Sequence, residues 1–179
     1  MPLRITYTLE NSNCVKRLSG LYPQNHILFP SNSIMNIIKV WYTLSMDTNM
    51  YLKTGMTGER SVKVTEENIA SAVGSGGLAV FSTPYMVALM EGACVEAVDK
   101  ALPDGFSTVG TVVEIKHLAA TPVDMNVRAV GELTVIDGRE LCFRVEAFDD
   151  TGKIGEGTHK RFIIENEKFM AKVRSKFGL

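Results

Sequence analysis

The sequence predicts an α+β fold in which a curved antiparallel sheet wraps around one long central helix. Two observations predict this fold. A nearly continuous apolar segment at helical spacing follows Thr83, and the second half of the chain alternates between apolar and polar residues, with turn signals between the segments. A helix that is apolar on almost every side is buried, and a curved sheet is the layer that can cover it.

The bulk composition is typical of one globular domain with a moderate core. The chain has 179 residues, of which 45% are hydrophobic and 22% are charged, and its formal net charge of −1 argues against nucleic acid or an anionic membrane as a partner. The cysteines are few, widely separated and without CxxC spacing, so we expect neither a disulfide framework nor a cysteine zinc site. No apolar run reaches the roughly 18 residues that span a bilayer, and the N-terminus lacks the order of a signal peptide. We therefore expect a cytoplasmic protein without a membrane partner.

Residues 1–50 differ from the rest, and we interpret them as an extension that precedes a domain at 51–179. They are rich in Asn and Ser and contain no catalytic motif. Three interpretations stay open at this point. The segment is a poorly ordered extension, or translation starts downstream at Met50 or Met56, or residues 34–44 form an amphipathic helix that packs on the domain or on a partner.

The domain begins with a short strand and a short helix. Residues 60–65 alternate and predict a strand. Thr65 followed by two acidic residues is typical of a helix N-terminus. The glycine-rich segment 74–77 ends that helix, and a mobile loop of small residues follows.

The central helix is predicted from about Pro84 to Leu102. Thr83 is a good N-cap residue, and proline suits the first helical position. The segment 103–105, Pro-Asp-Gly, ends the helix. Its interior carries one carboxylate, Glu91, among apolar residues. An ionised carboxylate in such surroundings is costly unless it is paired, so Glu91 requires an explanation.

Four strands and a closing helix follow the central helix. Asp137-Gly138 is the strongest hairpin signal in the chain, and Asp150-Thr151-Gly152 predicts a second turn. We expect the four strands to form a meander. The order of strand, helix and meander is that of a hotdog fold, with the sheet wrapped round the helix. The predicted segments are 107–119, 127–135, 141–147 and 154–164 as strands and 167–177 as the closing helix.

Three histidines and one threonine are the other candidates for chemistry. His26 lies in the extension and is interpreted as solvated. His117 ends an apolar strand, and it gains importance if it converges with Glu91, because a carboxylate and an imidazole are the usual pair in general acid–base catalysis. His159 lies beside glycines, which indicate close approach of backbone or ligand. Thr83 is either only a cap or a hydroxyl at a helix N-terminus, where free N–H groups hold an oxyanion.

Motifs for nucleotides, metals and a serine nucleophile are absent from the sequence. Segment 74–77 is not followed by the Lys-Ser/Thr of a P-loop, and no GxGxxG or GxSxG occurs. No cluster has metal-ligand spacing. We therefore expect no metal.

Four separated segments nevertheless resemble one family, the fluoroacetyl-CoA thioesterases of hotdog fold. They read MVALMEGACV, KHLAATP, DDTGKIGEGTHKRFII and EKFMAKVRSK. They occur in the order of that family, and the resemblance covers about residues 55–178. Several motifs in one order are more specific than any one of them.

The resemblance implies an activity and a set of site residues. The family cleaves acyl-CoA thioesters with a threonine, a glutamate and a histidine, which fall on Thr83, Glu91 and His117. A family glycine near the active site corresponds to Gly110, and a family arginine near the CoA corresponds to Arg161. The resemblance also implies a homodimer or a dimer of such dimers, with two joined sheets and sites near the interface. It implies no cofactor, because CoA is part of the substrate.

One departure from the family pattern concerns the lid before the catalytic threonine. The fluoroacetate-specific member has phenylalanines there, where this sequence has 74–77, Gly-Ser-Gly-Gly. Such a segment cannot form a hydrophobic gate. The resemblance therefore implies hydrolysis of a short or small acyl-CoA by Thr/Glu/His, and the departure in this segment argues against specificity for fluoroacetyl-CoA. A non-catalytic acyl-CoA binding protein and a hotdog enoyl-CoA hydratase or dehydratase are the alternatives.

Overall fold

The computed structural model describes residues 4–10, 13–19, 27–28 and 51–179. The chain divides into two units, 1–47 and 48–179, and each is described by itself. In the first unit, the strands β1 (Arg4–Glu10), β2 (Asn13–Ser19) and β3 (Ile27–Leu28) form an antiparallel sheet in that order. The helix considered for residues 34–44 lies outside the described residues. The interpretation of residues 1–50 as an extension stays a prediction.

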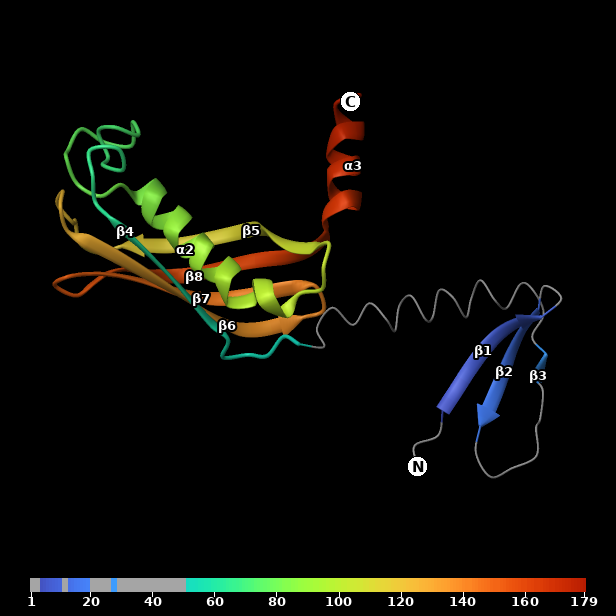
Figure 1. The fold of residues 1–179 in the computed structure, drawn as a ribbon. Coiled ribbons are helices and arrows are strands. Elements are labelled where there is room, and N and C mark those ends of the chain that lie inside the picture. The colour runs from blue at the N-terminus through green and yellow to red at the C-terminus, as the bar shows by residue number, and fades with distance from the viewer. Residues whose placement is uncertain (1–3, 11–12, 20–26, 29–50) are drawn as a thin grey trace. The chain divides into compact units, whose positions relative to one another are not determined.

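The second unit confirms the predicted α+β hotdog fold. Helix α2 (Thr83–Val98) and the short 3₁₀ helix η1 (Asp99–Ala101) lie against one face of a curled antiparallel sheet (Figure 1). The five strands and the last helix are β4 (Thr57–Lys63), β5 (Phe106–His117), β6 (Asn126–Asp137), β7 (Glu140–Asp149), β8 (Lys153–Glu165) and α3 (Asn166–Lys176).

The strand order is β4-β6-β7-β8-β5. Strands β6, β7 and β8 form the predicted meander, and the β6–β7 hairpin turns at Gly138, whose φ of 56° suits a glycine. Strand β5 does not join that meander, because it pairs with β8 at the far edge. The prediction of four consecutive neighbours was therefore wrong for β5. Alternation predicts that a segment is a strand, but it does not predict the neighbour.

The predicted short helix after Thr65 was also wrong, because this segment forms a turn. The side chain of Asn68 closes the turn: its Oδ1 accepts from Thr65 N at 2.9 Å, and its Nδ2 donates to Lys63 O at 3.0 Å. Asn68 is only 4% exposed. An asparagine that substitutes for backbone partners in this way favours a turn over a helix.

The chain then folds back on itself before it enters α2. Ile69 and Phe81 form an isolated antiparallel bridge, and Ala70 N donates to Val80 O at 2.8 Å. Residues 71–79 between them are all exposed. This segment, which we call the 71–79 loop, stands directly before the N-terminus of α2.

The core lies between α2 and the sheet, and glycines let the two approach closely. A Cβ on Gly58 of β4 would lie 2.2 Å from Ala93 O, and one on Gly131 of β6 would lie 2.7 Å from Cys94 Sγ. Both positions therefore require glycine on packing grounds. The largest fully buried side chains include Phe81, Met86, Met90, Leu133, Leu141, Phe143, Ile154 and Ile163.

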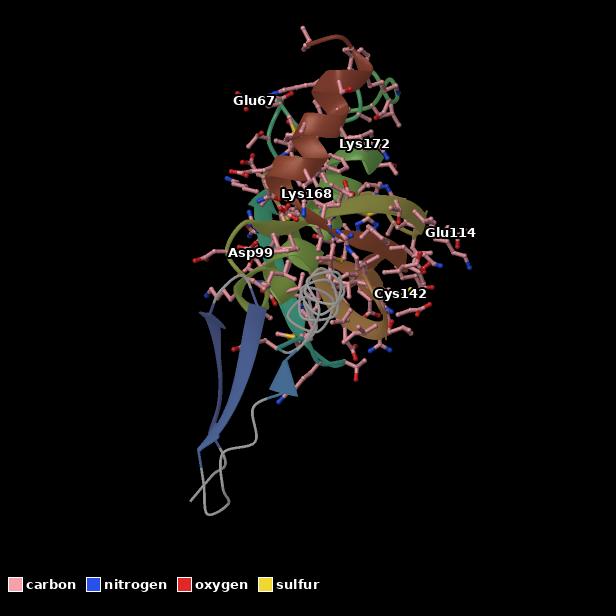
Figure 2. The ribbon with its side chains drawn as sticks, turned by 90° about the vertical axis from the view of Figure 1, so that its right-hand side faces the viewer. Glu67, Asp99, Glu114, Cys142, Lys168 and Lys172 are labelled. Atoms are coloured by element: carbon pink, nitrogen blue, oxygen red, sulfur yellow. The ribbon has the colours of Figure 1, made fainter. Side chains whose placement is uncertain are left out.

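The closing helix α3 stands apart from this core. It has no buried residue, and Phe169 and Met170 on its predicted apolar side are 37% and 46% exposed. Figure 2 shows Lys168 and Lys172 along this helix, above the sheet. Within the described part of the chain, no helix has the length and apolar character that crossing a membrane requires.

Candidate active site

The first turn of α2 differs from the predicted one by a single residue. Ser82, which is fully buried, is the N-cap residue, and its Oγ accepts from Tyr85 N at 3.4 Å. Thr83 is the first helical residue and Pro84 the second. The prediction of Thr83 as the cap was therefore wrong, and the consequence is chemical: the Thr83 hydroxyl is not needed by the helix.

That hydroxyl instead contacts the histidine at the end of β5. Thr83 Oγ1 lies 2.8 Å from His117 Nδ1. The other ring nitrogen, His117 Nε2, is buried and has no hydrogen-bond partner among the described residues. A buried polar atom without a partner is costly, so this nitrogen is available to a group that one chain does not supply.

A pocket of about 360 Å³ opens at this pair. Its walls come from the end of β5, the start of α2 and the segment around the 71–79 loop. In the first turn of α2, Pro84 has no N–H and Tyr85 N donates to the Ser82 cap, which leaves the N–H of Thr83. The lining residues are Ala70, Ser75, Val80, Phe81, Thr83, His117, Leu118, Ala119 and Ala120.

Glu91 lies in a second cluster, further along α2. Its Oε1 is 3.4 Å from His159 Nε2 and 3.7 Å from Arg161 Nη1, both on β8. The Glu91 side chain is 38% exposed, whereas those of His159 and Arg161 are 1% and 7% exposed. The charge of Arg161 offsets the cost of placing a carboxylate on this apolar helix.

Gly110 on β5 makes room for this cluster. A Cβ at that position would lie 2.7 Å from Glu91 Oε1 and 3.1 Å from His159 Cε1. The register of β5 against β8 shifts between Gly110 and Val112. The resemblance pointed to this glycine, and the structure places it against the carboxylate.

Arg161 is buried and firmly held. Its Nε donates to Thr108 Oγ1 at 2.8 Å and its Nη2 to Thr108 O at 2.9 Å. Its Nη1 lies 3.0 Å from His159 Nε2. Burial lowers the pKa of the Arg161 guanidinium, and the opposite charge of Glu91 acts against that effect. The guanidinium therefore faces the interior cluster around Glu91.

His159 was not among the predicted site residues. The sequence offered one signal, the flanking glycines, and one of them serves backbone packing: a Cβ on Gly157 would lie 2.1 Å from Glu114 O. Burial is the largest influence on the His159 pKa and lowers it. The hydrogen bond to Val112 O raises this pKa, whereas the positive charge of Arg161 lowers it further. His159 is therefore neutral near pH 7.

The chain thus brings Thr83 and His117 together and brings Glu91, Gly110 and Arg161 together, but the two groups are apart. Thr83 and Glu91 are separated by eight residues of one helix, which corresponds to a rise of about 12 Å. Within one chain, the carboxylate does not reach the histidine. No group of three or more His, Cys, Asp or Glu suited to a metal ion occurs among the described residues.

Comparison with known proteins first defines the class, which is the hotdog fold. A hot-dog-like protein from Thermanaerovibrio acidaminovorans superposes with a TM-score of 0.68 at 23% identity, over 75% of this chain and 99% of that one. A mutant of a fluoroacetyl-CoA thioesterase, solved with fluoroacetate, has a TM-score of 0.65 at 36% identity, over 70% of this chain and 98% of that one.

The sequence comparisons identify the family. The family model of the fluoroacetyl-CoA-specific thioesterases matches residues 64–167. The fluoroacetyl-CoA thioesterase of Streptantibioticus cattleyicolor is 47% identical over 97 residues, which are 54% of this chain and 70% of that protein. The chain belongs to the fluoroacetyl-CoA thioesterase family, a family of thioester hydrolases.

Proposed function

We propose that this protein hydrolyses a short or small acyl-CoA thioester to the free acid and CoA. The observation that carries the proposal is the 2.8 Å contact between Thr83 Oγ1 and His117 Nδ1 at the mouth of a pocket. It occurs in a chain of a thioesterase family, at the first residue of helix α2, where the positive end of the helix dipole favours a developing oxyanion.

Three residues would share the chemistry. The hydroxyl or the backbone N–H of Thr83 would hold the thioester carbonyl. Glu91 would attack that carbonyl or orient a water that does so. The C–S bond then breaks, and His117 delivers a proton to the leaving thiolate. If Glu91 is the attacking group, the acyl group remains on it as an anhydride, which a water then cleaves to release the acid and free Glu91. On either route water supplies the hydroxyl of the acid and the proton that His117 regains. No metal or cofactor is required in this scheme.

The scheme needs a second copy of the chain, because Glu91 and His117 are apart in one copy. We infer a homodimer in which the partner's Glu91 approaches the Thr83–His117 pair. The unpaired His117 Nε2 and the half-exposed Glu91 side chain support this inference.

The free edge of the sheet supports the same inference. Strand β5 has 12 residues and, within the described residues, pairs on one side only, with β8. Val112 and Val113 on it are 39% and 41% exposed, and Figure 2 shows Glu114 pointing outward at this margin of the domain. A long, exposed edge strand is a template for pairing with another chain.

The 71–79 loop would admit acyl groups other than fluoroacetyl. Its residues are exposed, and a Cβ on Gly74 or Gly77 would meet nothing within 4 Å. None of the loop residues is aromatic, so the loop places no aromatic side chain over the pocket. For the remainder of the substrate, the resemblance places Gly110 near the active site and Arg161 near the CoA, and this remains a prediction. We expect the enzyme to act in the cytoplasm.

The test of the activity is release of free CoA, measured with a thiol reagent. The panel runs from acetyl-CoA to long-chain and aryl acyl-CoAs, with wild type and Glu91→Ala side by side. Release that the variant loses while it stays folded supports the proposal. A change in enoyl-CoA absorbance without free thiol would indicate a hydratase, and binding without turnover would indicate a binding protein.

The test of the shared site is complementation between two inactive variants. Glu91→Ala and His117→Ala are purified separately, then unfolded and refolded together. A mixed dimer would contain one complete site and should have about half of the wild-type rate, so a mixture in which about half of the dimers are mixed should recover about a quarter of it. A mixture of Thr83→Ala and His117→Ala should gain nothing beyond the residual activity of Thr83→Ala, because both changes damage the same half of the site. Recovery in neither mixture would contradict the shared site.

A further inference from the structure

We propose that His159 and Arg161 are positioning residues that hold the Glu91 carboxylate in place while leaving it without a hydrogen bond. This inference rests on the proposed function, because it explains how the reacting carboxylate is kept available. Nothing in the sequence motifs assigns such a role to His159.

The first step is that Arg161 cannot move freely. Two of its three guanidinium nitrogens, Nε and Nη2, donate to the side chain and the backbone carbonyl of Thr108. A planar guanidinium that is fixed at two nitrogens has a fixed third one. Nη1 is therefore the nitrogen that is left to face α2 and Glu91.

The second step concerns the tautomer of His159. Its Nδ1 lies 2.7 Å from Val112 O. A carbonyl oxygen can only accept, so Nδ1 carries a hydrogen, and Arg161 Nη1 can only donate, so Nε2 carries a lone pair. Nε2 therefore accepts from Arg161 Nη1 at 3.0 Å. Nη1 of Arg161 therefore donates its hydrogen bond to His159 and not to the Glu91 carboxylate.

The third step is the state of Glu91. Its Oε1 lies 3.4 Å from a nitrogen lone pair, which cannot donate, and 3.7 Å from Nη1, which is beyond hydrogen-bond distance. The attraction to Arg161 still acts at that distance through charge. Because Gly110 adds no side chain there, the carboxylate is oriented by charge and its lone pairs stay free to attack or to take a proton.

This role of Arg161 differs measurably from a contact with CoA. A residue that binds CoA phosphates should affect KM for CoA esters and should not matter for a thioester that lacks the nucleotide. A positioning residue should affect kcat for both substrates. The test therefore uses the acyl-CoA that wild type cleaves fastest and the N-acetylcysteamine thioester of the same acyl group.

The first variant is Arg161→Lys, which keeps the positive charge and loses the planar guanidinium that donates to Thr108 at two nitrogens. We expect kcat to fall by about 10²-fold with both thioesters, because a small misplacement of a reacting group has an effect of that size, and we expect a KM close to that of wild type. The control is Arg144→Gln, an exposed residue of β7 whose ion pair with Glu132 is also exposed. An effect confined to KM of the CoA ester would overturn the inference.

Two further variants separate positioning by His159 from support of the fold. His159→Asn can still donate to Val112 O and loses the acceptor for Arg161, whereas His159→Gln keeps an acceptor near Nε2 and loses the donor at Nδ1. We expect the Gln variant to be about tenfold more active than the Asn variant and yet less stable to heat. Activity that follows thermal stability in both variants would overturn the inference. A wild type that releases thiol from neither substrate would overturn the proposed function and the inference with it.

Discussion

Helix α2 carries two polar groups that are built in opposite ways. At its N-terminus, Thr83 and His117 contact each other beside an exposed loop, and one ring nitrogen has no partner among the described residues. Eight residues on, Glu91 faces two buried side chains whose own hydrogen bonds are satisfied by β5.

The difference indicates which part of the site one chain completes. The cluster around Glu91 is held by hydrogen bonds between two paired strands, so its geometry is fixed by the fold. The Thr83–His117 pair lies where secondary structure ends and leaves a buried atom unsatisfied, which is typical of a place that receives a ligand or another chain. Reactivity at the two places should therefore respond differently to substitution.

The largest effect should come from Glu91→Gln, which removes the charge and keeps the size. We expect kcat to fall by about 10³-fold or more, since the group that attacks or activates water is lost, with a melting temperature near that of wild type because the side chain is half-exposed. Glu96→Gln is the matched control, because Glu96 lies on the same helix and, among the described residues, pairs only with exposed Arg60. A folded, dimeric Glu91→Gln enzyme with the wild-type rate would show that the Glu91 carboxylate is not a reacting group.

A smaller effect is expected from Gly110→Ala. The added methyl group would lie 2.7 Å from Glu91 Oε1, so the carboxylate must shift. We expect kcat to fall by about 10²-fold with a modest loss of stability, because the end of a flexible side chain can move. Gly92→Ala is the control, since its nearest neighbour would be Arg60 Cγ at 3.5 Å and its helical position favours alanine. Equal rates in the two variants would show that the position of the carboxylate is not critical.

Much of the fold could be predicted because it depends on local patterns. The apolar periodicity of α2, the alternation along β6 and β7 and the Asp137-Gly138 turn each depend on a few neighbouring residues, and each is present in the structure. The partner of β5 and the turn at Asn68 were missed. The first depends on residues far apart in the chain, and the second on a side chain that replaces backbone partners.

The candidate site was predictable by residue type but not by arrangement. The sequence singled out Thr83, Glu91 and His117, and the structure brings only two of them together in one chain. The role of His159 depends on the register of β5 against β8, which places Val112 O beside its ring. No pattern in the sequence specifies that register shift.

Two adjacent residues at the start of α2 have different proposed roles, because Ser82 caps the helix and Thr83 carries the reactive hydroxyl. Thr83→Val keeps the shape and removes the hydroxyl, so kcat should fall by about tenfold, the loss of one hydrogen bond of roughly 1.4 kcal/mol, with little change in stability. Ser82→Ala removes the N-cap instead, so unfolding should become easier by about 1 kcal/mol at a nearly unchanged rate. Chemical denaturation and steady-state kinetics on both variants check this. A reversed pattern would mean that Thr83 is the cap in solution.

The smallest predicted effect is a pH dependence of stability that arises from His159. Its pKa in the folded chain is lowered from 6.5 by burial, so the folded state binds a proton less readily there than the unfolded state does. Its contribution to stability is complete above pH 6.5 and is lost as the pH falls through the folded pKa. The melting temperature of wild type should therefore decline below pH 6.5, and the decline should be shallower in His159→Gln, which has no group to protonate. Parallel curves for the two proteins would show that the imidazole is solvated, and the cluster around Glu91 would then not be enclosed.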